Sequence, residues 1–269
     1  MSPKIAEFRH LHESGCFVVA NPWDRGSAIY LETLGFKALA STSAGFAWSA
    51  GRPDNAVTLE QILRHLEEIA NAVRVPLNAD FEGGFAREPE GVGVNVARAV
   101  KTGIAGLSIE DSTGDGANPL FELPLAVERI RAARMSIDRS GTGVLLTGRA
   151  EGFFVGRPDI KDTIRRLEAY AAAGADVLYA PAIRTKEDIS AVVKAVAPKP
   201  VNLLVTGNWT TVSEAAALGV RRISVGGALA RTAWIAFART AKEIIESGSF
   251  SGLSPGAPAI NLNEIFRQR

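Results

Sequence analysis

Two carboxylates followed directly by two glycines form the chemically richest feature of the chain. Asp80 and Glu82 end the apolar run 76–82, and Gly83 and Gly84 come next. Side chains alternate along a strand, so Asp80 and Glu82 can share one face, and the glycines allow a sharp turn or a close approach to a ligand. Because neighbouring carboxylates repel each other, the pair favours a bound cation. The alternative is a solvated strand end followed by a turn.

Polar residues also end most of the other apolar runs. Glu110 closes the run 106–111, and its carboxylate can converge with Asp80 and Glu82 if the runs are neighbouring parallel strands. Oxygen-only ligands favour a hard cation, so we expect Mg²⁺, with Mn²⁺ as an alternative. Trp23, after the first run, and Asn202, in the seventh, are candidates for contacting a substrate.

Arg149 is the candidate for holding an anionic substrate. It follows an apolar run that would bury its stem and leave the guanidinium at the strand end, where it can clamp a carboxylate or phosphonate. An internal salt bridge to Glu110, Asp111 or Glu151 is the other interpretation, and the two roles can coexist. Hydroxyls and N–H groups can also hold an anion at a loop, and the sequence offers these at Ser41, Thr42 and Ser43.

The three histidines do not support metal or relay chemistry. His10 and His12 lie near the amino terminus and His65 lies on an expected helix, and we predict all three to be surface residues. A zinc site or a Ser-His-Asp relay is therefore disfavoured.

Eight strand-helix repeats can position these residues. The strands are expected at 16–21, 37–43, 76–82, 106–111, 143–151, 176–181, 200–206 and 222–226. The helices are expected at 27–34, 59–73, 89–102, 124–140, 160–173, 186–196, 212–218 and 229–247. This alternation predicts a single (β/α)8 barrel domain over 1–269, with its active site at the carboxyl ends of the strands. A doubly wound sheet is the second choice, because it typically has fewer strands and no dinucleotide-type glycine turn follows the first strand.

Two segments fall outside the repeats. The stretch 44–55 is expected to be a long loop that acts as a lid or covers the barrel mouth. The tail 250–269 is expected to be an appended arm that packs on its own barrel or docks on a neighbouring subunit. Apolar residues along 233–245 recur at helical spacing and predict a core or interface helix.

Composition narrows the class of protein. Thirty basic and 29 acidic residues give no charge excess that would attract nucleic acid or an anionic membrane. Cys16 is the sole cysteine, and neither a signal core nor a membrane-length apolar run is present. We therefore expect a cytoplasmic protein without nucleic-acid or membrane partners.

The chain resembles the isocitrate lyase and phosphoenolpyruvate mutase superfamily over nearly its whole length. The resemblance rests on Asn-Pro-Trp-Asp at 21–24, the segments 42–54 and 220–226, Asn-Ala-Asp-Phe-Glu-Gly-Gly-Phe at 78–85, Ile-Glu-Asp at 109–111 and the segment around Arg149. It implies a (β/α)8 barrel that binds Mg²⁺ and stabilises a pyruvate-like enolate while a C–C or P–C bond of a small carboxylate or phosphonate is cleaved. It also implies a homotetramer in which the last helix, here the C-terminal arm, is exchanged between subunits.

The resemblance also assigns roles to individual residues. Asp80 matches the direct metal ligand, whereas Asp54, Glu82 and Glu110 match acids that hold metal-bound waters. The family binds the substrate carboxylate where Ser41, Thr42 and Ser43 stand, and Arg149 matches an arginine near the substrate.

Departures from the family pattern define a divergent member. Isocitrate and methylisocitrate lyases carry a Lys-Lys/Arg-Cys-Gly-His loop, and this chain has Ser-Thr-Gly-Asp-Gly-Ala-Asn at 112–118 instead. Asn78 stands where many members have aspartate, and Arg-Ala-Glu at 149–151 replaces Arg-Thr-Asp. The missing cysteine argues against these two lyase activities, and Asp115 or Asn118 is the candidate to replace it as acid or polar positioner.

Three functions remain open from the sequence. The first is a Mg²⁺-dependent lyase or hydrolase acting on a 2-oxo or 2-hydroxy carboxylate. The second is a barrel without turnover that binds a metabolite or serves assembly, which the loss of the cysteine favours and the retained acids oppose. The third is an unrelated phosphate-binding barrel isomerase, for which the Ser-Val-Gly-Gly segment at 224–227 is only a faint signal.

Overall fold

Eight parallel strands close into one barrel in sequence order. The computed structural model describes residues 1–254 and 260–267. Strand β1 pairs with both β2 and β8, so the sheet has no free edge. The strands are β1 (Phe17–Ala20), β2 (Ala38–Ala40), β3 (Leu77–Asp80), β4 (Gly106–Glu110), β5 (Leu145–Arg149), β6 (Val177–Tyr179), β7 (Val201–Leu204) and β8 (Arg222–Ser224). The predicted (β/α)8 barrel is confirmed, and the doubly wound sheet is wrong.

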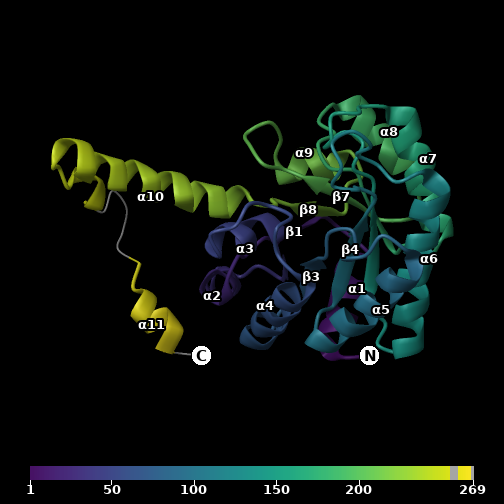
Figure 1. The fold of residues 1–269 in the computed structure, drawn as a ribbon, viewed down its shortest axis with the longest axis horizontal. Helices are drawn as coiled ribbons and strands as arrows, with labels where there is room; N and C mark the ends of the chain where they lie inside the picture. The colour runs from purple at the N-terminus through teal and green to yellow at the C-terminus, as the bar shows by residue number, and fades with distance from the viewer. Residues whose placement is uncertain (255–259, 268–269) are drawn as a thin grey trace.

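Helices follow the strands, and all but the last of them lie against the barrel (Figure 1). They are α2 (Arg25–Thr33), α3 (Ser43–Ser49), α4 (Leu59–Ala72), α5 (Pro89–Ala99), α6 (Leu123–Ser140), α7 (Ile160–Ala172), α8 (Lys186–Val196), α9 (Val212–Ala217) and α10 (Ala228–Ser247), with a 3-10 turn η1 (Val100–Thr102) after α5. Side chains at Asp24, Thr58 and Thr211 cap helix starts in reciprocal capping boxes. On α4, Ile62, Leu66 and Ile69 recur at helical spacing and are fully buried, which fixes that helix against the barrel.

Helix α1 (Pro3–Leu11) closes the amino-terminal end of the barrel. Phe8 is fully buried there, and a Cβ added at Gly106 would lie only 2.7 Å from the Phe8 ring and 2.6 Å from Asn78 Oδ1. His12, just after α1, bonds the Phe8 carbonyl through Nδ1 at 2.6 Å and packs edge-on against Phe17. Access to the barrel interior is therefore from the carboxyl ends of the strands.

The structure corrects two local predictions. The segment 44–55 is not wholly a loop, because Thr42 Oγ1 accepts the Gly45 N–H and starts α3. The surface prediction for the histidines holds only for His10, which is exposed. His12 is only partly exposed, and its ring packs edge-on against Phe8 and Phe17. His65 is buried on α4 and its ring stacks on Phe46 with centroids 3.9 Å apart. Burial lowers the pKa of His65 to about 4, so the ring is neutral at physiological pH.

The C-terminal segment leaves the barrel as an arm (Figure 1). Helix α10 extends away from the strands, the 3-10 turn η2 (Ser251–Leu253) packs on it, and α11 (Leu262–Arg267) lies against α2. Trp234, Ile235 and Phe237 are exposed on α10, so within one chain the predicted core role of 233–245 is wrong and the interface role remains. The predicted arm also includes 255–259 and 268–269, which lie outside the described residues.

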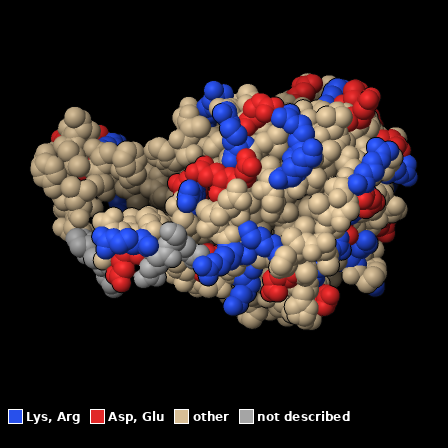
Figure 2. Space-filling view, turned by 90° about the horizontal axis from the view of Figure 1, so that it is seen from below, with Lys and Arg blue, Asp and Glu red and all other residues tan. Residues whose placement is uncertain are grey.

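Surface charge is mixed. On the face shown in Figure 2, Lys and Arg are interspersed with Asp and Glu over the barrel, and both signs of charge also occur on the arm. Among the described residues, no helix is long and apolar enough to span a membrane.

Candidate active site

A cavity of about 500 Å³ opens at the carboxyl ends of the strands. Strands β3, β4 and β5 end in Asp80, Glu110 and Arg149, so the barrel brings these residues to one rim. Most of the predicted site residues line this cavity, namely Ser41, Thr42, Ser43, Asp54, Asp80, Glu82, Glu110, Arg149 and Asn202.

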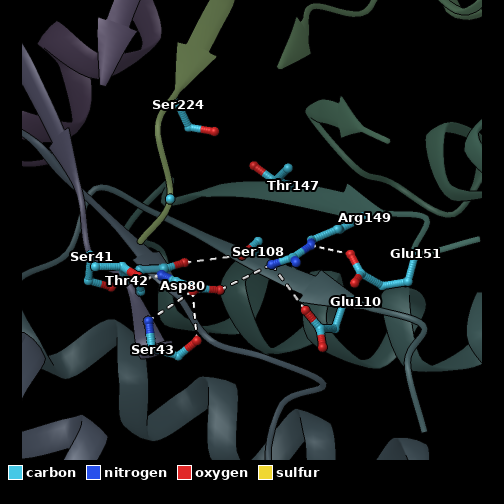
Figure 3. A network of polar contacts seen from close by, with 12 residues as sticks. Ser41, Thr42, Ser43, Asp80, Ser108, Glu110, Thr147, Arg149, Glu151 and Ser224 are labelled. Atoms are coloured by element: carbon cyan, nitrogen blue, oxygen red, sulfur yellow. Dashed lines mark hydrogen bonds and ion pairs between the residues drawn. The ribbon is translucent and has the colours of Figure 1, made fainter. Parts of the chain in front are cut away.

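Arg149 lies at the centre of a carboxylate cluster (Figure 3). Its Nη1 is 3.1 Å from Glu110 Oε2 and 3.4 Å from Asp80 Oδ1, and its Nε forms a close ion pair with Glu151. The strand register explains the cluster, since Glu110 on β4 lies directly opposite Arg149 on β5. Of the salt-bridge partners expected for Arg149, Glu110 and Glu151 are confirmed and Asp111 is wrong, because Asp111 bonds Arg166 and Tyr170 instead.

Asp80 is held from its other side by the end of β2. Its Oδ2 accepts the Ser43 N–H at 3.0 Å and the Ser43 hydroxyl at 2.9 Å. Its own backbone N–H donates to Ser41 Oγ at 2.9 Å (Figure 3). Ser41 and Ser43 therefore fix the orientation of the Asp80 carboxylate, which in turn contacts Arg149.

Glu82 carries an unsatisfied carboxylate oxygen. Its backbone has φ +47°, which turns the chain just after β3, and its Oε1 is buried without a hydrogen-bond partner. Burial, with added repulsion from Asp80 and Asp54, raises the pKa of Glu82 to about 8. Burial likewise raises the pKa values of Glu110, Glu151 and Asp54. The cluster therefore contains more acid than one arginine compensates, and it favours uptake of a cation or of protons.

The donor set fits a magnesium-type ion and not zinc. The side chains that line the cavity offer only oxygen and nitrogen atoms of non-histidine residues, and its acids supply oxygen ligands. Zinc sites, in contrast, usually include cysteine or histidine. No three His, Cys, Asp or Glu side chains in the described part of the chain are placed to ligate one ion together. Mg²⁺ commonly keeps several waters and takes only one or two carboxylates, so direct binding by Asp80 with water-mediated contacts to Glu82, Glu110 and Asp54 suits this arrangement.

Three predicted residues do not line the cavity. Trp23 is half-buried beside Gly45 near the start of α3. Asp115 and Asn118 are exposed on the loop 112–120, whose base is a bridge between Ser112 and Leu120. Asp115 accepts the Ala117 N–H, a bond within the loop itself.

Sequence reasoning missed several cavity residues. Glu151 was recognised only as a salt-bridge partner, and Tyr179 at the end of β6 and Arg222 at the start of β8 were not assigned to the site. Arg184 and Arg231 contribute from the loop after β6 and from α10. The alternation along β8 indicates that Arg222 and Ser224 share one face, but only the closed barrel shows that this face is the interior.

Known proteins match this architecture over most of the chain. The family model for phosphoenolpyruvate phosphomutase matches residues 8–245. A solved structure from Burkholderia cenocepacia J2315, provisionally described as a lyase/mutase, has a TM-score of 0.94 and 43% identity, covering 98% of this chain and 96% of that one. Oxaloacetate acetylhydrolase solved with its product oxalate has a TM-score of 0.85 and 29% identity, covering 97% and 93%. The oxaloacetate decarboxylase of Paraburkholderia xenovorans (strain LB400) is 28% identical over 269 residues, covering 94% of this chain and 86% of that protein.

The fold and the site define a (β/α)8-barrel enzyme of the lyase type, with an acid cluster and an arginine at its mouth. The chain belongs to the phosphoenolpyruvate phosphomutase family, within the superfamily that also contains the isocitrate lyases. The resemblance drawn from the sequence is confirmed.

Proposed function

We propose that this protein is a Mg²⁺-dependent lyase or hydrolase that cleaves a C–C bond of a small 2-oxo or 2-hydroxy carboxylate through a pyruvate-like enolate. The observation that carries the proposal is the buried, unpartnered Glu82 oxygen beside Asp80 in a cluster rich in acid. The similarity to oxaloacetate acetylhydrolase and oxaloacetate decarboxylase favours C–C over P–C cleavage.

Each residue of the cluster has a distinct part in this proposal. Asp80 would hold the ion directly, while Glu82, Glu110 and Asp54 would accept hydrogen bonds from its waters. A bound Mg²⁺ would supply positive charge to the enolate oxygen as it develops. Arg149 would hold the substrate carboxylate, and Glu110 and Glu151 keep its guanidinium in place.

The general acid or base is the open part of the proposal. Asp115 and Asn118 lie on an exposed loop, so they would have to approach the cavity by closure of the loop 112–120. If they do not, a carboxylate of the cluster or a metal-bound water would have to move the proton. The competing function is a barrel that binds the metabolite without turnover.

Oxalate titration tests the proposal. Oxalate mimics the planar pyruvate enolate, and we expect calorimetry to show binding that requires Mg²⁺ and is lost in Asp80→Ala. The matched control, Asp138→Asn, changes an exposed acid on α6 and should bind as the wild type does. Absence of oxalate binding with Mg²⁺ and with Mn²⁺ would contradict the metal-dependent enolate site.

We further propose a homotetramer in which α10 and the following segment exchange between subunits. The support is the row of exposed apolar side chains on α10, described above.

A further inference from the structure

A second buried arginine lies in the same cavity without any acid beside it. Arg222, the first residue of β8, is 3% exposed and lines the cavity wall. Its Nε donates to Asn202 Oδ1 at 2.8 Å and its Nη2 to Thr147 Oγ1 at 3.1 Å. Its Nη1 lies 3.4 Å from His12 Nε2. These acceptors are neutral, and among the described residues no carboxylate lies within ion-pair distance of Arg222.

Arg149 and Arg222 therefore differ in how far nearby acids compensate their charge. Arg149 is surrounded by Asp80, Glu110 and Glu151, whereas Arg222 retains an uncompensated charge. Burial lowers the pKa of Arg222 to about 10, which still leaves the group charged at neutral pH. An isolated buried charge is costly, so a site that keeps one is suited to receive an anion.

The position of Arg222 places this charge on the cavity floor. It begins β8, whereas Asp80, Glu110 and Arg149 end their strands. In Figure 3, Thr147, which accepts a hydrogen bond from Arg222, is joined by no contact to the acid cluster around Arg149. Small side chains at Ala40 and Ser108 line the wall and leave the barrel interior open.

The separation suits a short dicarboxylate. Asp80 lies opposite Ser108, and Ser108 lies opposite Thr147, which bonds Arg222. Adjacent strands are ~4.8 Å apart, so the Asp80 and Thr147 backbones are separated by about 10 Å along the sheet. Because the side chains of Asp80 and Arg222 extend into this space, only a short chain of a few carbons is needed to reach from an ion at Asp80 to Arg222.

We infer that Arg222, supported by Thr147 and Asn202, binds the far carboxylate of the substrate on the cavity floor and selects 2-oxo or 2-hydroxy dicarboxylates over monocarboxylates. The inference rests on the proposed function, because the near end of the substrate is taken to sit at Asp80. Arg222 acts as a specificity-determining residue, and it takes no part in the metal site.

Malate and 2-hydroxybutyrate form a matched pair of probes. They share the 2-hydroxy acid end and the chain length and differ only in the far carboxylate. With Mg²⁺ present, we expect calorimetry to show malate binding to the wild type at least about tenfold more tightly, the effect of one charge-assisted bond in a buried site. Equal affinities in the wild type would overturn the inference.

Four variants locate the effect. Arg222→Met should bring the two affinities together without weakening 2-hydroxybutyrate, and Arg222→Lys should keep part of the preference. Asn202→Asp would place a permanent counter-ion beside Arg222 and should also abolish the preference, which provides a second measurement if Arg222→Met does not fold. Arg184→Met removes a guanidinium from the exposed rim of the same cavity and should leave the preference intact. A preference lost in Arg184→Met and kept in Arg222→Met would place the far carboxylate at the mouth and overturn the inference.

Oxalate binding distinguishes failure of the floor site from failure of the proposed function. If oxalate binds with Mg²⁺ and the hydroxy acids show no Arg222-dependent preference, only the floor site is wrong. If neither oxalate nor either hydroxy acid binds with Mg²⁺, the proposed function and the floor site both fall.

Discussion

Glu82 is a carboxyl group whose surroundings oppose its charge. It is partly buried after β3, its Oε1 has no hydrogen-bond partner, and Asp80 and Asp54 repel a second negative charge. A pKa near 8 means that without a cation Glu82 keeps its proton at neutral pH. A cation that binds beside Asp80 would displace that proton, so metal affinity and pH should be linked.

Metal-free stability should fall as the pH rises. Folding raises the Glu82 pKa from its ordinary 4.5 to about 8, so the folded state holds more protons between these values and loses stability as pH increases from about 5 to 8. We expect a loss on the order of 3 kcal/mol in the free energy of unfolding, measured by urea titration at a series of pH values. Glu82→Gln should flatten that slope. A slope identical in the variant would contradict the assigned pKa.

Substitution of Asp115 and Asn118 tests whether either residue supplies the proton in catalysis. If either supplies a proton after loop closure, the double variant Asp115→Ala/Asn118→Ala should lose turnover by about a hundredfold or more, the usual contribution of general acid–base catalysis. Oxalate binding should be unaffected, because neither residue lines the cavity. Full turnover in the double variant would exclude both as the replacement for the family cysteine.

Arg129 on α6 joins the two loops that flank the acid cluster. It is 1% exposed and donates to the carbonyls of Ala86 and Arg87 at 2.6 Å and to that of Gly83. Its guanidinium also lies 4.0 Å from the ring centre of Phe121, at the end of the loop after β4. A helix on the outside of the barrel thus holds the turn that carries Glu82.

Arg129→Met should destabilise the protein and loosen this turn. Three carbonyls would lose the donor that the buried guanidinium supplies, and we expect a cost of about 3 kcal/mol in the free energy of unfolding, measured by urea titration. Mg²⁺ affinity should fall as well, because Glu82 would no longer be held. Arg131→Met, on the exposed side of the same helix, should stay within about 0.5 kcal/mol of the wild type. Equal stabilities for the two variants would refute the bracing role.

The strands and most of the helices were predictable from the sequence, whereas the short helix α3 and the burial of single polar side chains were not. Apolar runs of five to nine residues, separated by helical patterns, locate all eight strands, and polar strand ends identify Asp80, Glu110 and Arg149. Helix α3 was missed because a single threonine cap starts it within a glycine- and serine-rich stretch. His65 and Arg222 were missed because burial of a polar side chain depends on packing partners distant in the sequence.

The whole molecule consists of a barrel and an arm that offers apolar surface. Phe237 and Ile235 are 63% and 61% exposed, and Trp234 is 44% exposed. Their ring and aliphatic surfaces contact little else in the chain, although Trp234 and Phe237 pack edge to face. Exposed apolar surface of this kind is typical of an association surface.

Assembly should therefore depend on α10. We expect the wild type to sediment as a tetramer and Ile235→Lys/Phe237→Lys to sediment as a smaller species, because a charge in place of each exposed apolar side chain opposes its burial between subunits. Far-ultraviolet circular dichroism should show that the barrel remains folded. Lys242→Gln, on an exposed part of the same helix, is the control and should assemble normally. A monomeric wild type would contradict the exchanged-arm proposal.

Closure of the barrel at its amino-terminal end by α1 has a kinetic consequence. Phe8 and His12 close the opposite end, so in the proposed cleavage both products would depart by the route through which the substrate entered. The fragment nearer the mouth has to leave first, and the fragment behind it waits. Release is then ordered, and the two products should inhibit the forward reaction with different patterns.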